Sequence, residues 1–187
     1  MKKIFTFSII VGFAFIFLAF TNINSSDYNS SIAIEALNGD NTIVSVAAGN
    51  ENFTTLVAAV KAAGLVETLN SEGPFTVFAP VNDAFANLPE GTVEYLLKAE
   101  NKETLTAILT YHVVAGVFKA ADVVEAIKAN NGEFKITTVQ GGILTASLSG
   151  TNVILTDTKG NMSTVVIADV AASNGVIHAI DTVVMPE

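Results

Sequence analysis

Apolar residues recur at steps of three and four along the first half of the chain, and this spacing is typical of helices that bury one face. The clearest case is residues 53–66, where Phe53, Leu56 and Val60 fall on one side and Asn52 is expected to cap the helix. The same periodicity predicts further helices over residues 82–88, 92–98, 102–109 and 120–130.

Short alternating runs separated by glycines dominate the second half and predict antiparallel strands or hairpins. They cover residues 134–139, 143–148, 153–155, 165–170 and 176–184. An earlier strand is expected over residues 75–79, between Gly73–Pro74 and Pro80. A helix-rich first half followed by a strand-rich second half predicts an α+β fold with one hydrophobic core.

The N-terminus has the layout of a secretory signal. Lys2 and Lys3 precede an apolar run over residues 4–20, and small residues follow, so residues 1–21 are interpreted as a signal peptide with a cleavage site that could lie as late as residue 26. The alternative is an uncleaved membrane anchor, because the run is near the lower length limit for a span. Residues 22–41 are expected to form a flexible tether, and residues 42–187 the folded domain, placed outside the cytoplasm, in the periplasm or at the cell surface if the host is bacterial.

Charge and composition narrow the possible partners. The formal charge is −9 and becomes −11 once the two lysines of the signal are removed. All nine basic residues are lysines, and without arginine the bidentate contacts that read guanine and clamp phosphate are missing, so nucleic acid is not expected as a partner. The chain has no cysteine, which leaves core packing rather than disulfides to hold the domain together.

Four segments, in order, resemble the fasciclin domain family. Residues 73–85 (GPFTVFAPVNDAF) are similar to its first motif and residues 172–186 (ASNGVIHAIDTVVMP) to its closing motif. Residues 109–114 (LTYHVV) are similar to its central tyrosine-histidine segment, and residues 42–48 with 53–56 to its opening. One departure is Val81, where the family usually has threonine or serine.

The resemblance implies a wedge of strands packed with helices and a role in adhesion or extracellular interaction, with no reaction and no cofactor. The implied partner is an extracellular protein, a polysaccharide or a cell surface, and the protein is expected to be a monomer. A membrane would be contacted only through an uncleaved N-terminal segment. The alternative function is an extracytoplasmic carrier that holds a small apolar ligand in a cleft.

The motif residues are interpreted as structural. Phe75, Phe78 and Phe85 are expected to anchor the core, Pro80 to fix the exit from its strand, and Asn82 to cap the helix that follows. In the closing motif the structural residues are Asn174, Gly175, His178 and Asp181.

Two pairs of residues are candidates for interaction. Tyr111 and His112 belong to a segment that the family links to adhesion, and a strand over residues 111–115 would send the two side chains to opposite faces, so they would not act on one substrate. Asp169 and Val170 resemble an acidic-aliphatic pair implicated in integrin recognition in some animal relatives, with Val in place of the usual Ile. A solvated aspartate that closes a strand is the preferred interpretation, because nothing in the sequence indicates that an integrin is encountered.

Catalytic and metal-binding patterns are weak. Ser173, His178 and Asp181 could suggest a triad, but their spacing within one turn and strand gives no reason to expect the required geometry. Two histidines far apart and no cysteine exclude a typical zinc site. Residues 38–41 (NGDN) offer oxygen ligands for calcium but lack the EF-hand spacing. The protein is therefore expected not to be an enzyme.

Overall fold

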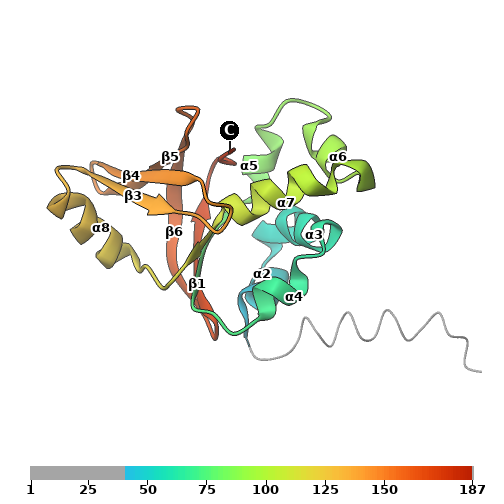
Figure 1. Ribbon diagram of the computed structural model, residues 1–187, viewed down its shortest axis with the longest axis horizontal. Helices are drawn as coiled ribbons and strands as arrows, with labels where there is room; N and C mark the ends of the chain where they lie inside the picture. The colour runs from blue at the N-terminus through green and yellow to red at the C-terminus, as the bar shows by residue number, and fades with distance from the viewer. Residues whose placement is uncertain (1–40, 187) are drawn as a thin grey trace, which may run out of the picture.

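The computed structural model describes residues 41–186, so the expected signal peptide and nearly all of the expected tether lie outside the described range. Helices occupy one side of the molecule and strands the other, with α8 against the outer strands (Figure 1). The helices are α2 (Ile43–Ala48), α3 (Thr54–Ala63), α4 (Val66–Asn70), α5 (Asn82–Ala86), α6 (Thr92–Leu96), α7 (Lys102–Tyr111) and α8 (Ala120–Ala129), with short 3₁₀ turns η1 (Glu51–Phe53) and η2 (Ala99–Asn101). The strands are β1 (Phe75–Pro80), β2 (Val113–Ala115), β3 (Glu133–Thr137), β4 (Ile143–Ser149), β5 (Asn152–Thr156), β6 (Met162–Ala172) and β7 (Gly175–Ile180). The expected α+β fold, helix-rich and then strand-rich, is confirmed.

The helix expected over residues 53–66 ends earlier, at Ala63, and a separate short helix, α4, begins at Val66. Gly64 adopts φ 73°, a left-handed conformation that glycine enters without steric cost, and its N–H bonds the carbonyls of Val60 and Lys61 to end α3. The expected cap at Asn52 is wrong, because the side chain of Asn50 accepts a hydrogen bond from the Asn52 N–H at the start of η1. Propensity placed the helix correctly, but local hydrogen bonding decided where it begins.

The seven strands form one sheet in the order β2-β1-β7-β6-β5-β4-β3. Neighbouring strands are antiparallel except β1 and β7, which run parallel from Phe75 opposite Gly175 to Pro80 opposite Ile180. Just beyond β3, the Val139 N–H donates to the Val113 carbonyl of β2 at 2.7 Å, so the two edges of the sheet meet there. The sheet therefore curls into a near-barrel.

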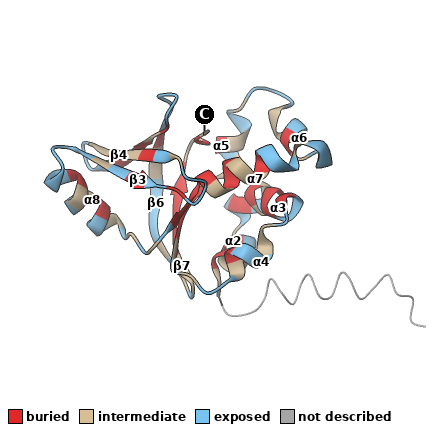
Figure 2. Ribbon diagram, in the orientation of Figure 1, coloured by how far each residue is buried: buried red, intermediate tan, exposed pale blue. Residues whose placement is uncertain are grey.

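The parallel pair β1 and β7 is the wall between two hydrophobic clusters. Alternate side chains of a strand point to opposite faces, and here both faces are covered. Val77 and Ile177 face the first cluster, which the helices α2, α3 and α7 complete, whereas Phe78 and Ile180 face the second, inside the curled sheet. Figure 2 shows the consequence, since the buried residues concentrate where the helices meet these strands. This is why residues 75–80 lack the alternation of a half-exposed strand.

The later strands differ from the sequence expectation in length. β6 runs over eleven residues and contains register shifts between Val165 and Ile167 and between Ile167 and Val170. β7 stops at Ile180 rather than continuing to residue 184. A bulge adds residues to one strand without adding pairs, so β6 bends and continues past the point where an alternating pattern predicts its end.

Candidate interaction site

Tyr111 and His112 lie at the end of a helix, not on a strand. Tyr111 is the last residue of α7 and His112 follows as its C-cap, so the expected strand begins only at Val113. Tyr111 is fully buried in the second cluster, where its hydroxyl donates to the Ile143 carbonyl at 2.7 Å. His112 is also buried but lines a cavity in the first cluster. The two side chains lie on different sides of the wall and do not act together, and neither reaches the surface in this conformation.

The ring of His112 is held through one nitrogen only. Nδ1 lies 2.8 Å from the Ile108 carbonyl, and because a carbonyl can only accept, Nδ1 carries the proton. Nε2 is buried without a hydrogen-bond partner among the described residues. Burial lowers the pKa of His112 to about 4, and the bond to Ile108 offsets only part of that effect. The ring is therefore neutral at physiological pH.

His178 is held at both ring nitrogens. It lies buried on β7, its Nε2 is 2.8 Å from the Phe118 carbonyl, and its Nδ1 accepts from the Asp169 N–H at 3.2 Å. Its ring stacks on Phe78 with centroids 5.7 Å apart. With both nitrogens bonded to backbone groups, His178 joins β7 to β6 and to the segment before α8.

Asp169 lies inside β6 and does not close it, so the expected position at a strand end is wrong. It lies in the register shift between Ile167 and Val170, where its φ is 58°. Its carboxylate accepts a hydrogen bond at 2.8 Å from the N–H of Ala120, the first residue of α8. The side chain is nevertheless exposed. Val170, beside it, packs against the first cluster. Of the candidate pair, Asp169 is exposed and Val170 is half-buried.

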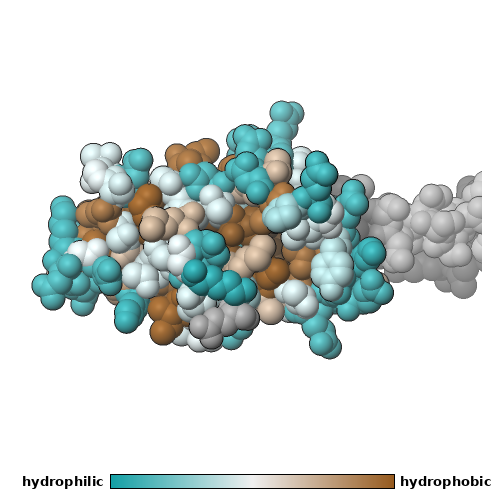
Figure 3. Space-filling model, turned by 90° about the horizontal axis from the view of Figure 1, so that it is seen from above, coloured by the Kyte–Doolittle hydropathy of each residue, from teal (hydrophilic) through white to brown (hydrophobic). Residues whose placement is uncertain are grey.

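Asp169 opens onto a cleft of about 860 Å³ between the β6–β7 turn, the segment before β1 and the start of α8. The cleft is lined by both charges and amides, among them Glu72, Lys119, Asp169, Ser173 and Asn174. Large exposed apolar side chains, by contrast, come from separate segments of the described chain, such as Tyr95, Val139 and Met162. Seen from above, hydrophobic and hydrophilic groups are interspersed (Figure 3). Scattered apolar exposure is ordinary for a folded protein, so the cleft is the better candidate for recognition.

Asn174 connects the segments that line this cleft through hydrogen bonds. Its Oδ1 accepts from the Ile43 N–H at 2.9 Å, at the first residue of α2, and its Nδ2 donates to the carbonyls of Leu69 at 2.7 Å and Ser71 at 3.0 Å. Gly175 follows, and a Cβ on it would collide with the Phe75 carbonyl of β1. The closing motif thus ties the parallel strand pair to two helices.

Four other motif residues also have structural contacts. Phe78 is buried, whereas Phe75 and Phe85 are partly exposed and pack against the first cluster. Pro80 is buried at the end of β1, opposite Ile180. The helix α5 has no side-chain cap, so the expected role of Asn82 there is wrong.

Asn82 instead caps α3, which begins almost thirty residues earlier. Its Oδ1 accepts from the Thr55 N–H and the Thr54 hydroxyl, both at 3.1 Å, and its Nδ2 donates to the Glu51 carbonyl at 2.7 Å. A helix N-terminus leaves several N–H groups without intrahelical partners, and a side chain from another segment satisfies them as well as a local one. Because the partner is remote, no local pattern could reveal it.

Ser173, His178 and Asp181 form no triad. The carboxylate of Asp181 accepts from the Thr164 N–H at 2.8 Å and from the hydroxyls of Ser163 and Thr182. Burial opposes ionisation of Asp181, but these bonds outweigh it and lower its pKa. Ser173 is exposed at the β6–β7 turn, and neither nitrogen of His178 is free for it.

A carboxylate that the sequence reasoning missed is Asp157. It is buried and accepts four hydrogen bonds, from the N–H groups of Lys159, Asn161 and Met185 and from the Asn161 amide, at 2.9 to 3.0 Å. Burial opposes its ionisation, but the bonds outweigh that effect and lower its pKa. The available signal was the run Asp-Thr-Lys-Gly-Asn, an Asx-turn pattern with Gly160 at φ 85°.

Among residues 41–186, no three His, Cys, Asp or Glu side chains gather closely enough to hold a metal ion. The calcium candidate at residues 38–41 lies outside the described residues except for Asn41. In the same part of the chain, no helix has both the length and the apolar character needed to cross a membrane.

Taken together, the sheet, the helical layer and the structural histidines define an α+β domain of the fasciclin type, and comparison with known proteins establishes the family. The Fasciclin domain family matches residues 51–186, and the chain belongs to it.

Among its relatives, protein sll1483 of Synechocystis is 49% identical over 186 residues, covering 98% of this chain and 96% of that protein. The transforming growth factor-beta-induced protein ig-h3 of Sus scrofa is 38% identical over 145 residues, which is 78% of this chain but 19% of the larger protein. A FAS1 domain pair from the insect cell adhesion molecule fasciclin I has the same fold, with a TM-score of 0.60 at 22% identity over 73% of this chain and 46% of that one.

Proposed function

We propose that this protein is a secreted or cell-surface module for adhesion or other extracellular interaction, without catalytic activity. The observation that carries the proposal is how the domain uses its reactive side chains. His178, Asp157 and Asp181 are each bonded to neighbouring backbone groups, and His112 is enclosed among hydrocarbon side chains. A site built to react would present at least one such group to substrate. Family membership supports the same function, since a solved relative is a domain pair of an insect cell adhesion molecule.

The proposed binding surface is the cleft around Asp169. Its walls come from elements that Asn174 and the parallel strands fix to one another, so the carboxylate stands on a rigid frame. A preorganised surface loses little conformational entropy on binding. The proposed partner is an extracellular protein, a polysaccharide or a cell surface, reached after export directed by residues 1–21 and presented on the tether formed by residues 22–41.

A matched pair of variants tests this surface. Asp169→Asn removes the charge but keeps an oxygen for the Ala120 N–H. Asp122→Asn removes the same charge from the same end of α8, where Asp122 accepts from the Lys119 N–H and lies outside the cleft lining. We expect saturable binding of the wild type to at least one surface in a panel of matrix proteins, polysaccharides and whole cells. Asp169→Asn should weaken it by about fivefold or more, as for loss of one charged contact, and Asp122→Asn should not.

The outcomes separate the function from the surface. Equal binding by the wild type and both variants would exclude the Asp169 cleft while leaving adhesion in place. No saturable binding to any member of the panel would contradict adhesion itself. Export is tested independently, by fractionating cells and sequencing the N-terminus of the mature protein.

The carrier alternative receives no support from the interior. The apolar cavity beside His112 measures about 30 Å³. Pockets that enclose drug-sized ligands are usually about 300 to 1,000 Å³. This interior cavity is therefore too small to hold a typical apolar metabolite.

A further inference from the structure

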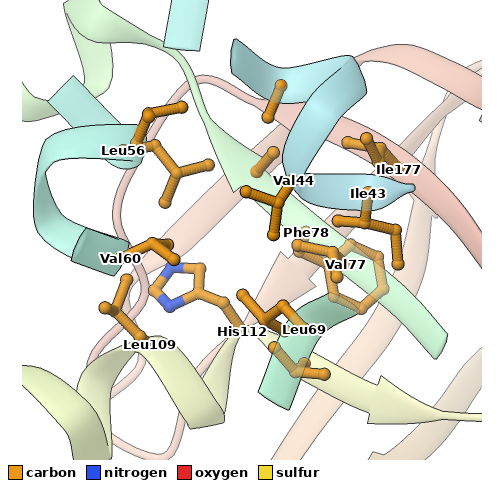
Figure 4. A pocket seen from close by; sticks show the side chains of 14 residues that line it. Ile43, Val44, Leu56, Val60, Leu69, Val77, Phe78, Leu109, His112 and Ile177 are labelled. Carbon is orange, nitrogen blue, oxygen red and sulfur yellow. The ribbon is translucent and has the colours of Figure 1, made fainter. Parts of the chain in front are cut away.

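The two edge strands of the sheet, β2 and β3, border a groove of about 380 Å³. The edges meet where the Val139 N–H bonds the Val113 carbonyl, and the groove lies beside that contact. Directly before β2, the His112 ring lies among aliphatic side chains of the first cluster (Figure 4), which fixes the start of the strand. The groove shares no lining residue with the Asp169 cleft, so it is a separate feature of the surface.

The backbone of β3 presents hydrogen-bonding groups to this groove. In an antiparallel pair, residues bonded to the neighbouring strand alternate with residues whose N–H and C=O point away from it. Thr138 donates to the Gly142 carbonyl, a pair in the register of β3 and β4. Lys135 and Thr137 are therefore turned away from β4, as is Val139, whose N–H reaches β2. Because β3 ends the sheet in the described part of the chain, the outward groups of Lys135 and Thr137 have no strand partner there.

The rest of the groove is mainly apolar. Its lining includes Val114 and Ala115 of β2, together with Phe118, Phe134 and Ile136. Phe118 and Phe134 are each half-buried, with ring centroids 6.2 Å apart, so part of both rings is accessible. Phe134 and Ile136 belong to the second cluster, on the inner face of β3. A strand added to β3 would direct every second side chain toward this face.

Lys135 is the only charged residue in the lining, although the chain carries a formal charge of −9. It is exposed, and it alternates with Phe134 and Ile136, so it lies on the outer face of β3. Opposite charges on the same face of neighbouring strands attract. Lys135 therefore favours a carboxylate at an outward position of an added strand.

We propose that the groove binds an extended segment of a partner protein, which pairs with the free edge of β3 as an added strand. In this mode of recognition, main-chain hydrogen bonds supply affinity and alternate side chains supply specificity. The segment alternates apolar residues, which face Phe118 and Phe134, with outward residues, one of which is acidic and lies beside Lys135. This site is additional to the Asp169 cleft and does not depend on it.

The probe is a blocked five-residue peptide that alternates valine and glutamate. It is titrated into the ¹⁵N-labelled full-length protein, and amide hydrogen exchange is followed by NMR. Without peptide, the amides of Lys135 and Thr137 should exchange quickly and that of Ile136, bonded to β4, slowly. The peptide should slow exchange at Lys135 and Thr137 by about tenfold or more, with half-saturation on the order of millimolar.

Two control peptides separate the main-chain and side-chain contributions. The same peptide with every backbone nitrogen methylated keeps its side chains but cannot donate to β3, and it should give no protection. A peptide with lysine in place of glutamate should bind about two- to fivefold more weakly. Equal protection by the methylated peptide, or no saturable response to the valine-glutamate peptide, would overturn the proposal.

Two lysines supply matched variants. Lys135→Gln should weaken binding of the valine-glutamate peptide by about two- to fivefold, whereas Lys128→Gln, at an exposed position of α8 outside the groove, should not. Lysine on an edge strand can also serve only to discourage association. Binding by Lys135→Gln that is unchanged or tighter would therefore refute the pairing with a carboxylate.

Other occupants of the groove would give a different result before any peptide is added. If residues 22–41 of the same chain or a second copy of the protein filled the groove, Lys135 and Thr137 would already be protected. That protection would be independent of protein concentration in the first case and would rise with concentration in the second. Either result would overturn the proposal.

Discussion

Acidification should destabilise this protein through His112 as the pH falls from about 6.5 to about 4. The ring is buried in a wall of hydrocarbon, and none of the other residues that line the cavity can carry a charge to balance an imidazolium. Burial accordingly lowers the pKa of His112 from 6.5 to about 4 in the folded protein. In the unfolded chain the same ring is solvated and takes up a proton near its ordinary pKa.

The direction and size of the change in stability follow from the difference between the pKa of His112 in the folded protein and in the unfolded chain. Between pH 6.5 and about 4 the unfolded chain binds a proton that the folded protein excludes, so the free energy of unfolding falls as the pH falls. Each unit of separation between the two pKa values is worth about 1.4 kcal/mol, which gives a total loss of about 3 kcal/mol from the 6.5 and 4 of His112. Total stabilities of single domains are commonly about 5 to 15 kcal/mol, so this loss is a large fraction. Above pH 7 the contribution should be fully present and constant.

The assay is urea denaturation across this pH range, for the wild type and for His112→Asn. Asparagine can place its Nδ2 donor near the position of Nδ1, so the bond to Ile108 can form, but nothing at the position titrates. The variant will be less stable at neutral pH because it leaves a larger cavity. The informative quantity is the change with pH, since other titrating groups are common to both proteins.

From about pH 7 to about pH 4.5 we expect the wild type to lose about 2 to 3 kcal/mol more than the variant, so the two curves converge. Parallel curves would refute the reasoning. They would mean that the folded protein accommodates the proton on His112, through water entry or a shift of the ring.

Three further substitutions test the framework, each by urea denaturation. Gly175→Ala should lower the free energy of unfolding by about 3 kcal/mol or more, because a Cβ there collides with the backbone of β1. The control Gly49→Ala, at φ −80° and with only ordinary van der Waals contacts, should change it by less than about 0.5 kcal/mol. Similar effects of the two substitutions would show that the strands separate easily. Asn82→Ala should lower the free energy of unfolding by about 1 to 2 kcal/mol, because the N-terminus of α3 loses its cap. The control substitution of the exposed Asn87 by alanine should lower it much less. Equal losses of stability would argue against capping of α3 by Asn82. Asp157→Ala should lower the free energy of unfolding by about 2 kcal/mol at neutral pH. Because the pKa of Asp157 is lowered in the folded state, the difference in stability between wild type and variant should vanish as the pH falls through that lowered pKa. A difference that persists in acid would mean that the charge of Asp157 does not stabilise the fold.

Local patterns in the sequence were sufficient for most elements of the fold. Helices α3, α7 and α8 come from apolar spacing, and the strands from alternation between glycines, because these periodicities record which face of an element is buried. The motifs also sufficed for the family, since they preserve order and spacing along the chain. Where a pattern ended ambiguously, as at Tyr111, the first two residues of the expected strand were in fact the end of a helix, and the strand begins at Val113. An apolar run alone does not distinguish a strand from a buried helix end.

Only the tertiary structure reveals the contacts between segments that lie far apart in the chain. Asn82 has every local property of a cap for α5, yet caps α3, because which N–H groups lie within reach depends on how the helices pack. The same holds for Asp169, whose place in a bulge and bond to α8 no neighbouring residue signals. His112 looked like half of a surface pair and is a buried side chain enclosed by seven elements or their ends. Sequence fixes which groups are present, whereas burial and partnership, which set their pKa and binding chemistry, arise only when remote segments meet.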